Sequence, residues 1–150
     1  MRLYLPEEKK ANFKQPLEPN TTNGWKVAYT ALFIIFIVTA ALNMLRIRAG
    51  FWTNYAADIV VPAWLYISIR GLGPTRRMNV LTRYLGARPE VTALALFTAS
   101  TLTEVSQFYW PQGIFSGCFD PRDLLAYAGG IGICYTFDKW TSAKTAAALD

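Results

Sequence analysis

Apolar residues fall into four long blocks along the chain, separated by shorter polar stretches. The blocks cover about residues 25–45, 55–70, 91–109 and 121–137. A membrane-spanning helix needs roughly 20 mostly apolar residues, and the first block has that length. The second and fourth blocks are shorter, and Pro62 inside the second predicts a kink or a local opening of the helix. The pattern predicts an all-α, polytopic membrane protein with four transmembrane helices.

The two ends of the chain are polar, and they set the predicted domain organisation. Residues 1–24 form an N-terminal extension that holds three prolines and three lysines. This extension is too polar to fold alone and too short to be a domain, so we expect it to become ordered by lying along another surface. Residues 25–140 form the predicted transmembrane domain, and residues 141–150 form a short tail.

The composition agrees with a membrane protein and argues against several other classes. Hydrophobic residues make up 53% of the chain and charged residues 17%, against about 25% charged residues in typical soluble domains. The net charge of +5 does not indicate nucleic-acid binding, because the basic residues lie in loops rather than on one helical face. Histidine is missing from the sequence, which removes the commonest general base and metal ligand. The sequence therefore names no metal, no cofactor and no catalytic residue.

Lysine and arginine are distributed unequally between the two predicted sides of the membrane. Twelve of the 15 lie in the N-terminal segment, the 70–90 loop and the C-terminus, whereas the other two loops hold only Arg46, Arg48 and Arg122. Loops rich in these residues stay on the cytoplasmic side. We therefore predict that both termini are cytoplasmic and that the chain crosses a bacterial inner membrane several times.

This topology brings four acids that are far apart in sequence to the outer side of the membrane. They are Asp58, Glu104, Asp120 and Asp123. A carboxylate in hydrocarbon costs roughly 2.5–3.5 kcal/mol even on the lenient insertion scale, so these groups need partners. Helical spacing places Gln107 on the same face of the third helix as Glu104, and Tyr127 on the same face of the fourth as Asp123. We predict that these six residues form a polar cluster where the two helices meet.

Small residues on the fourth helix are candidates for close packing between helices. Ala126 and Gly130 form one pair spaced by four residues, and Ala128 and Gly132 form another. Such pairs let two helix backbones approach each other closely. Because the first pair shares a face with Asp123, we expect that face to meet the third helix.

Purely structural roles remain open for several of these residues. The polar face of the third helix could serve only in helix packing, although packing alone does not need the charge of Glu104. Asp120 before Pro121 is typical of a helix N-cap, and an acid in the first turn, such as Asp123, suits the helix dipole. Asp58 also stands near the start of a helix. Alternatively, two carboxylates could act as acid and base, or several could bind a cation through their oxygens.

Three groups of residues follow one another in an order typical of a known family. They are Asp58 near the start of the second helix, Glu104-x-x-Gln107 followed by Phe108 and Tyr109, and Phe119-Asp120-x-x-Asp123-x-x-Ala126-Tyr127-x-x-Gly130. Over roughly residues 28–140 the chain resembles the VanZ-like superfamily, most closely its branch of small membrane proteins known as DUF2809. The family's loop often carries an Arg, whereas residues 111–118 hold no basic residue. The resemblance implies a link to the founding member, which is associated with resistance to a glycopeptide antibiotic.

Two classes of function follow from these observations. The first is a non-catalytic accessory subunit of a larger membrane complex, such as a respiratory or photosynthetic one, with the N-terminal extension lying on a neighbouring subunit. The second is an envelope-acting protein whose outward acids bind or process a lipid headgroup or a cell-wall precursor. The expected partners are membrane lipids and other membrane protein subunits, and the first class makes an enzyme the less favoured choice.

Overall fold

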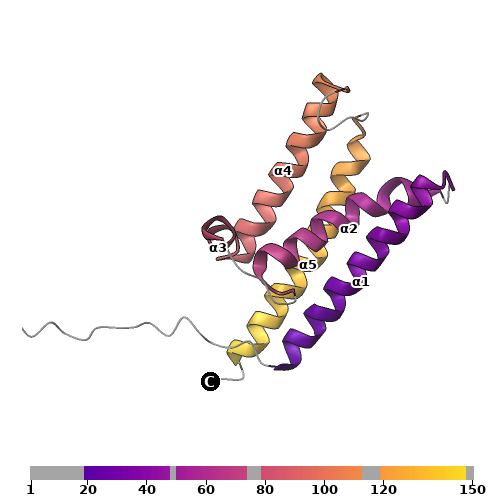
Figure 1. Cartoon of the computed structure of the whole chain (residues 1–150). Coiled ribbons are helices and arrows are strands. Elements are labelled where there is room, and N and C mark those ends of the chain that lie inside the picture. Colours follow the sequence, from indigo (N-terminus) through magenta and orange to yellow (C-terminus); the bar gives the residue numbers. More distant parts are fainter. Residues whose placement is uncertain (1–18, 48–49, 74–78, 113–118, 148–150) are drawn as a thin grey trace, which may run out of the picture.

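The fold is all-helical, as predicted. The computed structural model describes residues 19–47, 50–73, 79–112 and 119–147, and no strand occurs within these ranges. Residues 1–18, 48–49, 74–78, 113–118 and 148–150 lie outside them. The helices are α1 (Pro19–Met44), α2 (Phe51–Arg70), α3 (Val80–Leu85), α4 (Pro89–Tyr109) and α5 (Pro121–Ala147) (Figure 1).

Proline and glycine stand at three of the helix ends. Pro89 and Pro121 begin α4 and α5, where the missing N–H of proline costs nothing. Gly71 closes α2 in the left-handed conformation, with φ of 71°, and its N–H turns back to the carbonyls of Ile67 and Ser68. That conformation favours glycine because a Cβ atom would be strained there. Local chemistry therefore fixes these three boundaries.

Several features differ from the predicted helix pattern. Helices α1 and α2 begin at Pro19 and Phe51 rather than near residues 25 and 55, so residues 19–24 of the predicted polar extension are helical. The short helix α3 lies within residues 70–90, which were predicted as a loop. Helix α5 begins at the predicted residue 121 but continues past residue 137 to Ala147, so most of the predicted C-terminal tail is helical. Hydropathy alone ended the predicted helix where Asp138 and Lys139 begin a more polar stretch, but charged side chains do not stop a helix whose backbone bonds continue.

Helix α2 is the central element of the bundle. It packs against α1, α4 and α5, and α4 also packs against α5. In Figure 1, α4, α2 and α1 stand side by side and α5 crosses behind α2. The core between these helices consists of Trp25, Ala63, Tyr66, Ile67, Leu72, Leu96, Ile131 and Cys134. The most enclosed part of the chain is therefore the contact of α2 with α5.

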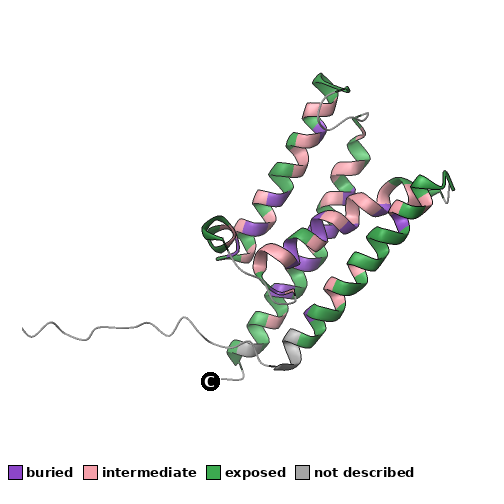
Figure 2. Cartoon of the chain, viewed as in Figure 1, coloured by how far each residue is buried: buried purple, intermediate pink, exposed green. Residues whose placement is uncertain are grey.

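Most apolar side chains of helix α1 are exposed. Between Asn23 and Met44 only Trp25 and Thr39 are buried, and Ile34 and Val38 in the middle of the helix are 55% and 52% exposed. Figure 2 shows this contrast, with buried residues concentrated on α2, α4 and α5 and the length of α1 mostly exposed. Among the described residues, Asn23–Met44 is the one segment long and apolar enough to cross a membrane by length and composition.

Candidate functional site

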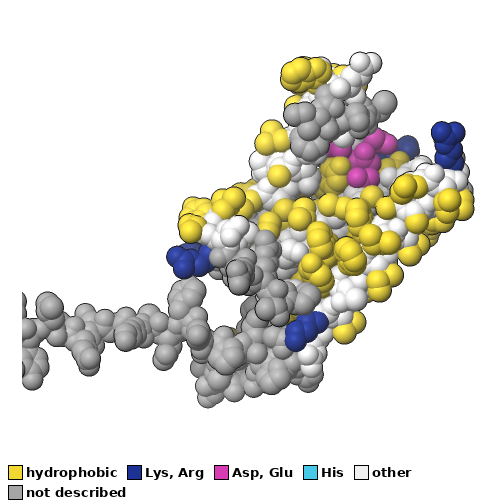
Figure 3. Space-filling model, in the orientation of Figure 1, with side chains coloured by type: hydrophobic (Ala, Val, Ile, Leu, Met, Phe, Trp, Pro, Cys, Tyr) yellow, Lys and Arg dark blue, Asp and Glu magenta, His cyan; other side chains and the backbone are white. Residues whose placement is uncertain are grey.

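Four acids from three helices gather at one end of the bundle. We call Asp58 of α2, Glu104 of α4, and Asp120 and Asp123 beside and within the first turn of α5 the acidic cluster. Figure 3 shows acidic side chains gathered in one spot on this face of the molecule. The sequence placed these acids together by topology alone. The structure brings them within reach of one another in three dimensions.

Glu104 is the deepest member of the acidic cluster. Its side chain is 1% exposed, and the hydroxyl of Tyr127 on α5 donates a hydrogen bond of 2.7 Å to its Oε1. Its second oxygen, Oε2, is buried and has no hydrogen-bond partner among the described residues. A buried polar atom without a partner costs about 1–3 kcal/mol, and more if it is charged. An oxygen left in this state points to a missing donor.

Asp58 and Asp123 stand around Glu104 and are half-buried. Asp58 lies beside the Tyr127 hydroxyl and within electrostatic range of Glu104. Asp123 lies within electrostatic range of Asp58, Glu104 and Asp120. Like charges this close repel one another unless protons or cations compensate them. The acidic cluster is therefore a site of concentrated negative potential.

Asp120 has the structural role that was left open for it. Its Oδ1 accepts a hydrogen bond of 2.9 Å from the backbone N–H of Arg122, which caps the start of α5. Its Oδ2 accepts a longer bond of 3.4 Å from the Tyr55 hydroxyl. The exposed guanidinium of Arg122 lies beside Tyr55 and Asp120. Asp120 thus links the acidic cluster to a cation at its rim.

Gln107, the sixth predicted member of the cluster, is not joined to it. Its side chain is half-buried, and no hydrogen bond connects it to the acids within the described parts of the chain. The hydroxyls of Thr103 and Ser106 bond to carbonyls of their own helix, at 2.6 and 2.7 Å. Among the described residues of this polar face of α4, Glu104 is the one whose side chain forms a hydrogen bond to another helix. A role in helix packing remains open for it.

The small residues of α5 pack differently from the prediction. Gly130 is buried, and a Cβ atom there would collide with the backbone carbonyl of Ile59. The expected close approach exists, but its partner is α2 rather than α4. Ala126 is also buried on this side. The second pair meets no other described helix, because Ala128 is exposed and nothing lies within 4 Å of a Cβ built on Gly132.

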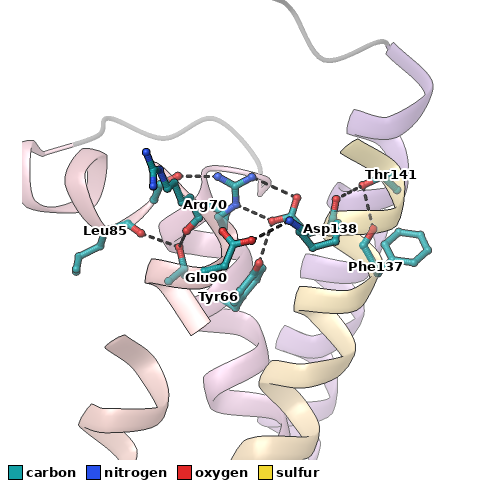
Figure 4. A network of polar contacts seen from close by, with 11 residues as sticks. Tyr66, Arg70, Leu85, Glu90, Phe137, Asp138 and Thr141 are labelled. Carbon is teal, nitrogen blue, oxygen red and sulfur yellow. Dashed lines mark hydrogen bonds and ion pairs between the residues drawn. The ribbon is translucent and has the colours of Figure 1, made fainter. Parts of the chain in front are cut away.

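A second polar network, which the sequence reasoning missed, lies further along the α2–α5 contact. Asp138 accepts bonds from Arg70 at 2.6 and 3.3 Å and from the Tyr66 hydroxyl at 2.9 Å. Arg70 also donates a bond of 2.6 Å to the carbonyl of Gly86. Figure 4 shows Arg70 and Tyr66 converging on this one carboxylate. We call these three side chains the Arg70 network.

The signal for the Arg70 network was present in the helical periodicity of α5. Continuing from Tyr127 in steps of three and four residues leads through Cys134 to Asp138 on the same face. The side chains of Arg70 and Asp138 are only 16% and 3% exposed, so the pair is nearly buried and nearly neutral as a unit.

Nearby, Lys139 forms an exposed ion pair of 2.8 Å with Glu90, which lowers the pKa of Glu90 and raises the pKa of Lys139.

The two polar networks differ in their chemistry. The Arg70 network pairs its acid with a base, whereas the acidic cluster holds several carboxylates and one rim arginine. In the described part of the chain, no three acidic or thiol side chains converge closely enough to hold a metal ion. Among the described residues, the acidic cluster therefore holds more carboxylates than cations, and its oxygens are hydrogen-bond acceptors.

Comparisons with protein-family models, with curated proteins and with solved structures find no match. The resemblance to the VanZ-like superfamily stays a prediction.

Proposed function

We propose that the chain is an integral membrane protein whose four long helices all cross the bilayer. The exposed apolar side chains of α1 support this proposal, because a soluble protein rarely exposes so large a contiguous apolar surface. Two ring contacts hold α1 in the fold, from Tyr29 and Phe33 to Trp64 on α2, with ring centres 5.3 and 6.0 Å apart. Helix α1 thus behaves as part of the bundle.

The charge pattern of α2, α4 and α5 also fits a bilayer. These helices carry their inward-facing polar groups in the acidic cluster and the Arg70 network, with apolar residues such as Ala63 and Ile131 between them. Polar residues in membrane helices face the bundle interior and pair with one another. Charged and polar side chains lower the mean hydropathy of a membrane helix. Helices α2, α4 and α5 can therefore cross the bilayer although only α1 is strongly apolar along its length.

Within the membrane, we propose that the protein acts as a non-catalytic accessory subunit that docks against other helices. The supporting observation is a shallow apolar groove on the exposed face of α5. It is lined by Ala128, Gly129, Gly132, Ile133, Thr136, Phe137 and Trp140. Small residues at four-residue spacing allow a second helix to approach closely. The chain's own described helices leave this face open at Gly129 and Gly132, whereas Phe137 at its edge contacts Trp25 of α1.

Filling the groove tests the subunit proposal. Gly132→Leu places a large side chain where nothing lies within 4 Å, so the fold should tolerate it. We expect the variant to leave the larger complex on a native gel in mild detergent, because the partner helix can no longer approach. Ala99→Leu on the exposed surface of α4 is the matched control and should stay bound. Wild-type protein that migrates alone would contradict the proposal.

One observation favours the second class, an envelope-acting protein that binds a lipid headgroup or a cell-wall precursor. It is the buried Oε2 atom of Glu104, for which no described residue supplies a hydrogen-bond partner. Since a missing donor explains this atom, Glu104→Gln should lower resistance of expressing cells to a glycopeptide antibiotic. Glu90→Gln changes an equally acidic but exposed residue and should not. Equal resistance of both variants and wild type would contradict this candidate.

A further inference from the structure

A polar pocket lies between the end of α1 and the start of α2. It has a volume of about 580 Å³ and is lined by Asn43, Arg46, Ile47, Thr53 and Asn54. No acid is among the described residues of this lining, so the wall of the pocket carries the positive charge of Arg46 without a counter-charge. The two asparagine amides add further N–H donors. The pocket therefore suits an anionic group that accepts several hydrogen bonds.

Arg46 occupies a backbone position that favours glycine. Its φ is 56°, and it is the one non-glycine residue with a positive φ in the described parts of the chain. At this turn the N–H of Arg46 bonds to the carbonyl of Asn43 at 3.1 Å, and the N–H of Ile47 bonds to that of Leu42 at 3.0 Å. Helices commonly close with this pattern of bonds around a glycine, because other side chains are strained in the left-handed conformation. The turn itself does not need a guanidinium, so a separate role of the side chain accounts for arginine here.

The guanidinium of Arg46 is available to a ligand. It is exposed, and neither of the ion pairs formed between described residues involves it. The amides of Asn43 and Asn54 are exposed as well. The hydroxyl of Thr53, in contrast, bonds to the carbonyl of Gly50 at 3.1 Å. Arg46 and the two amides therefore supply donors from the α1 side and the α2 side of the pocket.

The pocket lies at the polar end of the α1 span. The segment long and apolar enough to cross a membrane ends at Met44, two residues before Arg46. Trp52, beside the pocket residue Thr53, is 61% exposed, and tryptophan is enriched where a membrane protein meets the lipid headgroups. If α1 crosses the bilayer as proposed, the pocket is at the level of the headgroup phosphates.

We propose that this pocket binds a phosphate group, with the Arg46 guanidinium as its counter-charge and the amides of Asn43 and Asn54 as further donors. A guanidinium presents paired N–H donors that match phosphate oxygens. The tetrahedral oxygens of phosphate also accept bonds from several directions, as donors on two helices require. Gly50 begins α2 without a side-chain cap, so the positive end of the helix dipole adds to the attraction.

Two sources can supply this phosphate, a phospholipid headgroup and a water-soluble phosphate ester. The inference goes beyond the proposed function, because it uses neither the groove on α5 nor the acidic cluster.

Native mass spectrometry of the full chain, delipidated in mild detergent, tests the ligand. The probes are dioleoyl phosphatidylglycerol, dioleoylglycerol, which has the same chains without the phosphate, and glycerol phosphate. We expect the phospholipid to bind about tenfold or more tightly than dioleoylglycerol, because only the phospholipid forms charged hydrogen bonds with Arg46. Equal binding of the two lipids would overturn the proposal.

Competition then distinguishes the two sources of phosphate. Given the preference for the phospholipid, its displacement by excess glycerol phosphate supports a site that recognises the phosphate group from either source. Retention of the phospholipid supports a site for a lipid phosphate, held in place by the acyl chains as well.

Variants of Arg46 test the residue itself. Arg46→Gln should abolish the tenfold preference, whereas Arg83→Gln, which removes an exposed arginine on α3, should keep it. Arg46→Gly should also abolish the preference, yet unfold at no lower temperature than wild type, because glycine adopts a φ of 56° without strain. This second variant keeps the turn and so separates ligand binding from folding. An undiminished preference in either Arg46 variant would refute the assignment.

Discussion

Individual residues inside this bundle owe their roles to what lies across the helix contact. Gly129 and Gly130 are neighbours with opposite surroundings: a Cβ on Gly129 would meet nothing within 4 Å, whereas one on Gly130 would meet the Ile59 backbone. Glu104 and Asp138 are both buried acids, but only Asp138 has a base as its partner. Residue type alone predicts neither difference.

Gly130→Ala should destabilise the protein by about 1–3 kcal/mol, because the added methyl group forces α5 away from α2. Gly129→Ala is the matched control and should stabilise the helix by about 0.5–1 kcal/mol, since alanine loses less backbone entropy. Thermal unfolding in detergent measures both. Similar unfolding midpoints for the two variants would show that α2 and α5 are not in close contact at this position.

Asp138→Asn should destabilise the protein by about 3–5 kcal/mol, because it leaves the nearly buried Arg70 without its counter-charge. Arg70→Met combined with Asp138→Leu removes both charges and should unfold at a higher temperature than Asp138→Asn alone, since no buried charge is left unpaired. Glu90→Gln breaks only an exposed ion pair and should leave the unfolding midpoint unchanged. If the double variant lost as much stability as two independent charge removals would cost together, Arg70 and Asp138 would not be a coupled pair.

At the scale of helices, the sequence predicted the features that depend on local patterns of residues. Four long helices follow from the apolar blocks, and Pro121 begins α5 where the fourth block was predicted to begin. The extension of α5 could not be predicted in this way, because Asp138 is stabilised by Arg70, which lies 68 residues away in sequence.

The candidate site could also be predicted only in part, because it depends on contacts between residues that are distant in sequence. Helical spacing identified Glu104, Asp123 and Tyr127 as inward-facing, and the structure joins Glu104 to Tyr127. Gln107 has the same spacing but makes no bond to the acids within the described residues. The packing partner of Gly130 was predicted as α4 and is α2. Periodicity gives the face of a helix, whereas the rotation and order of packed helices depend on contacts between distant segments.

Helix α1 provides a test of the membrane assignment at this scale. Ile34→Arg puts a charge on an exposed position in the middle of α1, which costs about 2.5–3.5 kcal/mol if that position faces lipid. We expect a glycosylation-reporter fusion to show reduced membrane insertion. Leu81→Arg on the exposed surface of α3 is the control and should insert normally. Normal insertion of Ile34→Arg would indicate that α1 faces water.

Taken as a whole, the molecule is asymmetric along its length. The acidic cluster lies at the end where α4 finishes and α5 begins, and the Arg70 network lies toward the other end of α2 and α5. The predicted topology places the acidic cluster on the outer side of the membrane and the Arg70 network on the cytoplasmic side. The headgroup proposed for the acidic cluster would then belong to the outer leaflet, so the orientation decides which lipids can reach it.

Cysteine labelling of intact cells determines the orientation. Cys118 falls in the loop predicted to be external and should react with an impermeant maleimide. Cys134 is buried against the Ala63 carbonyl, so it should be spared on either side and cannot report topology. Ser142→Cys, introduced with Cys118→Ser, places a thiol at an exposed position near the end of α5 and should react only after the cells are permeabilised. If Ser142→Cys reacts in intact cells, the C-terminus is outside, the acidic cluster faces the cytoplasm, and an outer-leaflet ligand is excluded.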